Sequence, residues 1–182
     1  ADKIRQDAAK TIKELKNLGI KKVVMLTGDA KETAENVAKE LGIDEYYAEL
    51  LPEEKVEKLE ELKYYNGSRN NTAFIGDGIN DAPVLACADV GIAMGGLGSD
   101  AAIEAADIVI MEDALSKIPQ AVKMARYTKK IIMQNITGAL GVKLIFLAMG
   151  ALGIANMWEA VFADVGVALL AVMNSIRTLR VK

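Results

Sequence analysis

Two long apolar stretches near the end of the chain constrain its fold most. Residues 131–158 contain a single ionisable side chain, Lys143, and residues 160–176 contain only Asp164. Each stretch is close to the roughly 20 apolar residues that a helix needs to cross a bilayer. Neither carries the polar face of a helix that packs on a soluble core, although a pair of buried helices in a soluble bundle is the alternative. We therefore expect two transmembrane helices, over about 131–155 and 158–178.

Basic residues flank these stretches, while the short connector between them has no Lys or Arg. Lys and Arg concentrate in cytoplasmic segments, so both ends of this chain are expected in the cytoplasm, in a multi-pass protein of the plasma membrane. Residues 119–130 mix charges with apolar side chains and are expected to form an amphipathic connector. The flanking cations are Lys123, Arg126, Lys129 and Lys130 before the first stretch, and Arg177, Arg180 and Lys182 after the second.

The first part of the chain has a different composition. Residues 1–118 hold 14 Lys and Arg against 23 Asp and Glu, whereas residues 119–182 hold 8 against 2. The acidic balance argues against nucleic acid as a partner. A single Cys and no His exclude an intramolecular disulfide framework and the common structural zinc sites. Cys87 lies in an apolar run and is expected to be a buried small hydrophobe rather than a reactive thiol.

Within residues 1–118, helical patterns alternate with short apolar runs. Apolar residues at near-helical spacing predict helices that end at Gly19 and Gly42 and a third that opens with Pro52. Repeated strand–helix units of this kind predict an α/β fold in which helices cover both faces of a parallel sheet. Chemistry in such folds sits beyond the carboxyl ends of the strands. The expected strands are 23–26, 73–75, 90–93 and 108–111.

Two short motifs carry groups that suit a phosphoryl ligand. Thr27-Gly28-Asp29 follows the first expected strand and precedes a helix, which offers a hydroxyl and backbone N–H groups at a helix N-terminus. Taken alone, a turn with an N-cap also explains this triplet. Lys55, in Pro52-Glu53-Glu54-Lys55, can place a cation on a phosphate, although most lysines at a helix start are solvated.

The most specific motif is Ile75-Gly76-Asp77-Gly78-Ile79-Asn80-Asp81-Ala82-Pro83, again directly after an expected strand. Two carboxylates four residues apart, with glycines that let the backbone approach closely, suit Mg²⁺ bound by carboxylates, waters and a phosphate. A turn needs one Gly and one Asp or Asn, so a purely structural explanation fits this segment poorly. Asp77 and Asp81 are therefore the candidate Mg²⁺ ligands.

In this order on a strand–helix scaffold, the three motifs resemble the phosphorylation domain of P-type ATPases, which has a haloacid-dehalogenase-like fold. The resemblance covers nearly the whole chain. It implies an ATP-hydrolysing enzyme in which Thr27, Gly28 and Lys55 hold the phosphoryl group, with Asp29 in the same catalytic loop. It also implies that Asp77 and Asp81 serve Mg²⁺ and that Asn80 supports the site. Positioning and charge neutralisation of this kind catalyse phosphoryl transfer.

The two charged residues in the apolar stretches indicate which branch of the P-type ATPases the chain resembles. A charge at the bilayer centre costs at least about 2.5 kcal/mol, so Lys143 and Asp164 are candidates for an ion path. A mutual salt bridge that holds the two helices together is the alternative, and both descriptions can hold at once. Lys143 followed by Asp164-Val165-Gly166 resembles the zinc-, cadmium- and lead-exporting branch of the heavy-metal P-type ATPases. The resemblance implies that Asp164 ligates the transported ion and that Lys143 is a neighbouring charge.

A hard carboxylate suits Zn²⁺ better than Cu⁺, although a copper- or cobalt-transporting pump of the same family is an alternative.

The family also has an Asp-Lys-Thr-Gly-Thr segment with the phosphorylated aspartate, a nucleotide-binding domain, an actuator domain and a Cys-Pro-Cys motif. None occurs in this sequence. We therefore expect the C-terminal part of a longer polypeptide, inactive alone, with a sheet that lacks its first strand. The missing N-terminal part and the lipid bilayer would be its partners. A phosphatase domain with a membrane anchor and a non-enzymatic metal-binding subunit are the other hypotheses.

Overall fold

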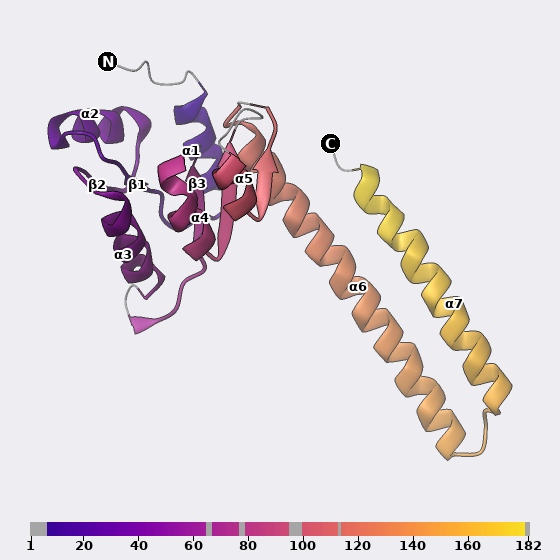
Figure 1. Ribbon diagram of the computed structural model, residues 1–182. Helices are drawn as coiled ribbons and strands as arrows, with labels where there is room; N and C mark the ends of the chain where they lie inside the picture. The colour runs from indigo at the N-terminus through magenta and orange to yellow at the C-terminus, as the bar shows by residue number, and fades with distance from the viewer. Residues whose placement is uncertain (1–6, 65–66, 77–78, 95–99, 113, 181–182) are drawn as a thin grey trace. The chain divides into compact units, whose positions relative to one another are not determined.

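The computed structural model describes residues 7–64, 67–76, 79–94, 100–112 and 114–180. The chain divides into two compact units, Ala1–Pro119 and Gln120–Lys182. The first unit alternates helices with short strands (Figure 1). Its elements in chain order are α1 (Ala8–Asn17), β1 (Val24–Leu26), α2 (Lys31–Leu41), β2 (Glu45–Tyr47), α3 (Pro52–Lys63), β3 (Ala73–Gly76), the 3-10 turn η2 (Ile79–Asp81), α4 (Ala82–Cys87), β4 (Val90–Met94), α5 (Asp100–Ala105) and β5 (Ile108–Ile110).

The strands form two parallel sheets. β1 pairs with β2, so that Val24 lies opposite Glu45. β4 lies between β3 and β5 in a three-stranded sheet, with Ala73 opposite Val90. Within the described ranges, no strand joins β1 to β3. The expected parallel α/β fold is confirmed, and its strands are divided between two sheets.

Each of the four expected strands is present within a residue or two of the predicted bounds. Three short elements were not predicted: the strand β2 and the helices α4 and α5. β2 consists of Glu45, Tyr46 and Tyr47 and has no aliphatic run to mark it. α4 and α5 have 6 residues each, which is too short for a helical period to emerge from the sequence.

The core of the first unit is built around α4. Val84 and Leu85 are 0% and 1% exposed, and α4 packs on α3, α5, β3 and β4. A Cβ atom on Gly91 of β4 would lie 2.5 Å from the carbonyl oxygen of Leu85. Glycine is therefore required at this position, because the strand backbone touches the helix backbone. The remaining large core side chains include Leu59, Ile92, Met94 and Ile110.

The first two helices end where the sequence predicted, and their ends are linked. Gly42 ends α2 with a φ of 69°, the left-handed region that glycine adopts without strain. The Lys16 ammonium group at the end of α1 donates to Gly42 O at 2.7 Å and to Asp44 Oδ1 at 2.6 Å. Asp44 also accepts the Val23 N–H at 2.8 Å. The Lys16 hydrogen bond, followed by the one from Val23, lowers the pKa of the Asp44 carboxyl group.

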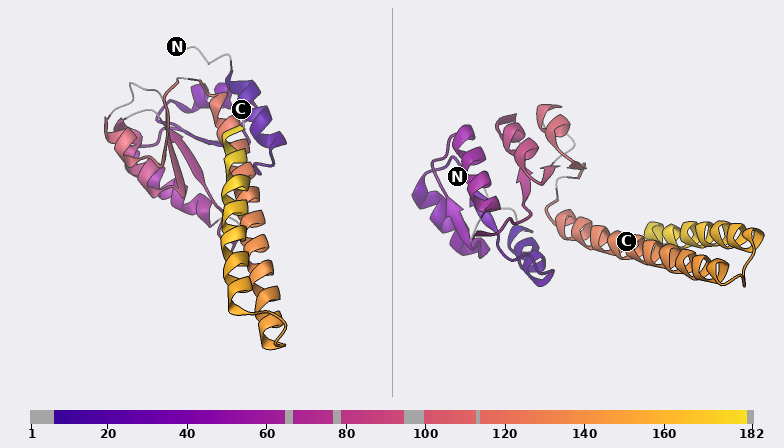
Figure 2. Two further views of the ribbon diagram at one scale, coloured as in Figure 1. Left: turned by 90° about the vertical axis from the view of Figure 1, so that its right-hand side faces the viewer. Right: turned by 90° about the horizontal axis from the view of Figure 1, so that it is seen from below.

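The second unit is a pair of long helices, α6 (Lys117–Ala151) and α7 (Met157–Ser175), followed by the 3-10 turn η3 (Ile176–Arg180). The two helices run side by side in opposite directions (Figures 1 and 2). Both are long and apolar enough to cross a membrane. α6 includes the expected amphipathic segment without a break and ends four residues before the predicted residue 155. The cause is Gly153, whose φ of 72° lets the Ile154 N–H donate back to Met149 O at 2.9 Å.

Candidate phosphoryl-transfer and ion sites

Thr27, Gly28 and Asp29 form a compact turn at the carboxyl end of β1. The Asp29 N–H donates to the Thr27 hydroxyl oxygen at 3.1 Å, and this hydroxyl donates to Asp29 Oδ2 at 3.0 Å. Thr27 is half-buried, while Gly28 and Asp29 are exposed. The turn therefore holds a hydroxyl group and a carboxylate together at the end of the strand, with the Gly28 backbone open between them.

A second loop, after β2, is fastened to this turn. The Thr27 N–H donates to Tyr47 O at 3.0 Å, and the Thr27 carbonyl accepts the Leu50 N–H at 3.0 Å. The Glu49 N–H donates to Asp29 O at 2.9 Å. Glu49 has a φ of 59°, in the left-handed region that non-glycine residues rarely adopt. No sequence pattern predicted this loop, since its interactions are made by backbone groups.

The loop leads directly into α3, which carries Lys55. Pro52 occupies the first helical turn, and the Leu51 N–H donates to Glu54 Oε2 at 2.7 Å, so both residues favour a helix start here. Lys55 lies one turn further, and its N–H donates to Leu51 O at 3.0 Å. The Lys55 ammonium group lies 2.8 Å from Asp81 Oδ1, and the two side chains are 15% and 16% exposed. The structure thus joins two sequence motifs that lie 26 residues apart.

Gly76, the last residue of β3, makes room for Asp81. A Cβ atom on Gly76 would lie 2.9 Å from Asp81 Cβ and 3.0 Å from Asp81 Oδ2. A side chain on residue 76 would therefore displace the carboxylate. Asn80 is exposed in the turn before Asp81, whereas Asp77 lies outside the described residues.

The structure thus brings Lys55, Gly76 and Asp81 together and holds Thr27 to Asp29. The segment from Tyr47 to Lys55 connects these two groups, because it is hydrogen-bonded to the Thr27 turn at one end and carries Lys55 at the other. Within the part of the chain that the structure describes, no three His, Cys, Asp or Glu side chains are grouped closely enough to hold a metal ion. The sequence singled out Lys55 as a phosphate ligand but did not predict its ion pair with Asp81.

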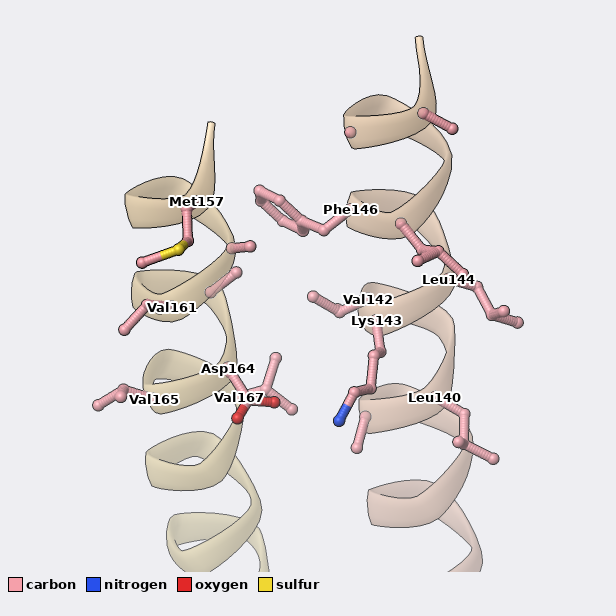
Figure 3. Close-up of a pocket in the computed structure, with 16 residues that line it drawn as sticks. Leu140, Val142, Lys143, Leu144, Phe146, Met157, Val161, Asp164, Val165 and Val167 are labelled. Carbon is pink, nitrogen blue, oxygen red and sulfur yellow. The ribbon is translucent and has the colours of Figure 1, made fainter. Parts of the chain in front are cut away.

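The two charged residues of the helical hairpin share one cavity. Lys143 of α6 and Asp164 of α7 both line a space of about 860 Å³ between the helices, and the other lining residues are apolar or glycine. Figure 3 shows the ends of the two charged side chains directed toward each other. Over the described residues of the hairpin, no ion pair joins them, and both side chains are exposed. The alternative in which a salt bridge between these two residues holds the helices together is therefore not seen over the described hairpin.

The comparisons with known proteins agree with both parts of the chain. Residues 1–89 match the family of haloacid dehalogenase-like hydrolases. Over all 182 residues the chain is 60% identical to a cadmium, zinc and cobalt-transporting ATPase of Bacillus subtilis (strain 168), covering 26% of that protein. It is 58% identical over 177 residues to a zinc-transporting ATPase of Synechocystis sp., covering 24% of it.

A solved structure extends the similarity to three dimensions. The crystal structure of a zinc-transporting PIB-type ATPase in its E2.Pi state superimposes with a TM-score of 0.90 and 45% sequence identity. The match covers 98% of this chain and 28% of that chain. The chain thus spans about a quarter of the length of the curated relatives that it matches. With a haloacid-dehalogenase-like α/β unit, two long apolar helices and relatives that match both, the chain belongs to the P-type ATPase family, and the relatives it matches are named as cadmium- and zinc-transporting members.

Proposed function

We propose that this chain is the C-terminal part of an ATP-driven pump that exports divalent heavy-metal ions such as Zn²⁺ and Cd²⁺. One observation carries the proposal, namely that two charged pairs occur in the same chain. Lys55 and Asp81 form an ion pair beyond the end of β3, and Lys143 and Asp164 line one apolar cavity of the hairpin. The first pair suits phosphoryl transfer and the second suits passage of a cation. The relatives that are named as cadmium- and zinc-transporting ATPases support the same choice of ions.

In the α/β unit, the Lys55 ammonium group and the Thr27 hydroxyl group would hold the transferred phosphoryl group. Phosphoryl transfer spreads negative charge over the phosphoryl oxygens, so a nearby cation and fixed donors lower its barrier. The exposed Gly28 backbone adds an N–H at the same turn. Asp29 would position the Thr27 hydroxyl group, which donates to Asp29 Oδ2 at 3.0 Å and would turn this proton to a phosphoryl oxygen on binding.

The donor chemistry around Asp81 fits a magnesium ion. Its carboxylate is a hard oxygen ligand of the type that Mg²⁺ prefers, and Gly76 leaves space beside Oδ2. Asp81 and Asp77 would hold the ion, with Asn80 supporting their loop. When bound, Mg²⁺ would neutralise charge on the phosphoryl group. Lys55 would keep Asp81 in place through the Oδ1 contact of 2.8 Å.

The nucleophilic aspartate would come from the rest of a longer protein, on a strand that enters between β1 and β3. Over the described residues these strands pair only with β2 and β4, so each has an edge without a strand partner. Ile75 in β3 is 37% exposed, unlike the side chains of a completed parallel sheet. A strand that filled this position would place its carboxyl end beside both the Thr27 turn and the Lys55–Asp81 pair.

In the hairpin, Asp164 would ligate the transported ion, and Lys143 would be the neighbouring charge. The carboxylate offers the hard oxygen donor that suits a divalent ion better than Cu⁺. Burying a cation next to Lys143 is unfavourable unless the ammonium group moves or Asp164 compensates it. The opposing charges would therefore let the ion bind and then leave. Both ends of the chain would lie in the cytoplasm of a plasma-membrane protein, as the basic flanks predict.

The test is Mg-ATP hydrolysis by the full-length pump that contains this chain, purified in detergent and titrated in turn with Zn²⁺, Cd²⁺, Pb²⁺, Co²⁺ and Cu⁺. Stimulation by the divalent ions but not by Cu⁺ is the expected result. Stimulation by Cu⁺ alone would contradict the choice of ion and favour a copper pump. Hydrolysis that no metal ion changes would contradict transport altogether and favour a membrane-anchored phosphatase.

A further inference from the structure

A cluster of amide and hydroxyl side chains joins α6 to α7 close to the end of α7. The Asn174 amide donates to Asn135 Oδ1 at 2.8 Å and to Gln134 Oε1 at 3.4 Å. The Asn135 amide donates to Ser175 Oγ at 2.9 Å and to Ala171 O at 3.2 Å. Arg177 donates to Asn174 Oδ1 at 2.8 Å. These contacts between the helices are polar, whereas the contact surface beyond them is apolar.

The asparagines occupy the contact seam of the two helices. Half-buried positions recur at spacings of three and four residues on each helix, as in a coiled coil. Beyond Asn135 and Asn174 these positions hold small or apolar side chains, which pack acceptably in more than one register. A polar residue at such a seam position selects a register, because every other register leaves its amide without a partner. The seam consists of Asn135, Ala139, Val142 and Phe146 on α6, and Ala163, Val167, Ala171 and Asn174 on α7.

The register that the cluster selects also determines which residue of α7 lies opposite each residue of α6 along the rest of the hairpin. In an antiparallel pair, each step along α6 corresponds to one step back along α7. Lys143, eight residues beyond Asn135, is therefore level with residue 166, eight residues before Asn174. Asp164 lies two residues away, or about 3 Å along the helix axis at about 1.5 Å per residue. A slip of three or four residues would shift Asp164 by about 4.5 to 6 Å relative to Lys143.

We propose that Asn135 and Asn174 are positioning residues that lock the register of α6 and α7, so that Lys143 and Asp164 face one another in their cavity. The inference rests on the proposed function only for its consequence, which is the correct geometry of the ion site. The lock itself is a property of the hairpin. It acts through the helix backbones, since the cluster lies eight residues from Lys143 and ten from Asp164.

Disulfide cross-linking in the full-length pump, in membrane vesicles, measures the register directly. Val142→Cys is combined with Val167→Cys, which is level with it in this register, or with Ala163→Cys or Ala171→Cys, one turn away on either side. Trypsin cuts after Lys143, so the two cysteines fall on different peptides and mass spectrometry counts the linked products. The level pair should exceed the others by about fivefold, a ratio within what the four hydrogen bonds between the helices support in a membrane.

Asn174→Leu should reduce this preference to about twofold, since it removes two of the four hydrogen bonds between the helices. The matched control is Thr137→Val, which removes a hydroxyl group from an exposed position of α6 and should leave the cross-linking pattern unchanged. If Asn174→Leu does not insert, Asn135→Ala carries the test, because it removes the partner and leaves α7 unaltered. A pattern that stays unchanged in the inserted variant would overturn the proposal.

The register and the pump activity are read separately. Cross-linking requires no transport, so a loss of preference supports the lock even if the parent pump shows no metal-stimulated hydrolysis. Where the pump is active, Asn174→Leu should raise the Zn²⁺ concentration for half-maximal stimulation several-fold, because the ion site is misaligned. If Zn²⁺ stimulation stays normal although the cross-linking preference is lost, the link between the helix register and the ion site would be overturned.

Discussion

Several charged side chains of the α/β unit, among them Lys55, Asp81 and Asp89, have partners inside that unit, whereas those of the hairpin cavity face each other without forming an ion pair. Lys55 and Asp81 are 2.8 Å apart and largely buried, and Asp89 accepts three hydrogen bonds from Arg69 and Thr72. Over the described residues, no ion pair involves Asp164. The α/β unit therefore arranges its charges by its own packing, while under the proposed function the charges of the hairpin would meet the transported ion.

The strongest test of this difference between the two units is to remove the Asp164 carboxylate from the hairpin. Asp164→Asn in the full-length pump should abolish metal-stimulated ATP hydrolysis, a loss of at least about 100-fold, because an amide cannot supply the negative charge that offsets a divalent ion. Thermal unfolding should change little, since Asp164 forms no ion pair within the described hairpin. Hydrolysis measured against Zn²⁺ and Cd²⁺ concentration checks both parts.

Glu159 offers a control in the same helix. It caps α7 through reciprocal bonds with Asn156, at 3.0 Å and 3.1 Å, and lies outside the cavity that holds Asp164. Glu159→Gln keeps an acceptor for the Asn156 N–H and should retain metal stimulation. If Asp164→Asn behaved in the same way as Glu159→Gln, the charges of the hairpin would have no special part in transport.

The corresponding change in the α/β unit is Lys55→Met. It removes the cation from the proposed phosphoryl site, which should lower hydrolysis by about 10²- to 10³-fold. Unlike Asp164→Asn, it should also destabilise the protein, because Asp81 is then left largely buried without its partner. Hydrolysis and thermal unfolding of the same preparation separate the two effects.

Lys39→Met is the matched control for this change. Lys39 pairs with Glu35 at 2.6 Å, yet its side chain is 71% exposed on α2. Water screens such a pair, so neither activity nor melting temperature should change measurably. A Lys55→Met protein that kept full activity would remove Lys55 from the phosphoryl site and leave it a structural residue.

The sequence predicted more of the fold than of the site. Local periodicity and glycine positions were enough to predict the strands, the two long apolar helices and the helix ends at Gly19 and Gly42. The Lys55–Asp81 pair joins residues 26 apart, and the Thr27 turn is fixed by backbone bonds to the loop after β2. No local pattern encodes such contacts. The strand β2 was missed because Glu45-Tyr46-Tyr47 has no aliphatic run.

Two glycine substitutions should affect the two units in opposite directions. A Cβ atom at Gly91 would lie 2.5 Å from Leu85 O, so Gly91→Ala must displace backbone and should destabilise the α/β unit by about 2 to 3 kcal/mol. At Gly138 of α6 nothing lies within 4 Å of the added atom. Gly138→Ala should therefore stabilise the helix by about 0.5 to 1 kcal/mol. Thermal unfolding in detergent checks both, and equal effects of the two changes would contradict the difference in packing.

The smallest predicted effect depends on pH and concerns Asp89 in the α/β unit. The Thr72 N–H bond at 2.8 Å is the main cause that lowers the pKa of this carboxyl group, with further contributions from the Thr72 hydroxyl and from Arg69. A lowered pKa in the folded state means that the charged form contributes stability above the unfolded pKa of about 4, and that this contribution is lost as the pH falls through the folded value. Asp89→Asn should cost about 1 kcal/mol at pH 7.

The difference between Asp89→Asn and the parent protein should close as the pH falls below about 4, because the parent carboxyl group is then also becoming neutral. Denaturant unfolding at pH 7 and at pH 3 measures it. Glu35→Gln, at an exposed ion pair on α2, should show no measurable difference at either pH. An equal deficit for Asp89→Asn at both values would mean that shape, rather than charge, fixes residue 89. In that case the hydrogen-bond partners of Asp89 would stabilise the α/β unit mainly through packing. The α/β unit and the hairpin would then differ in how deeply their charged side chains are buried, and not in how those charges are paired.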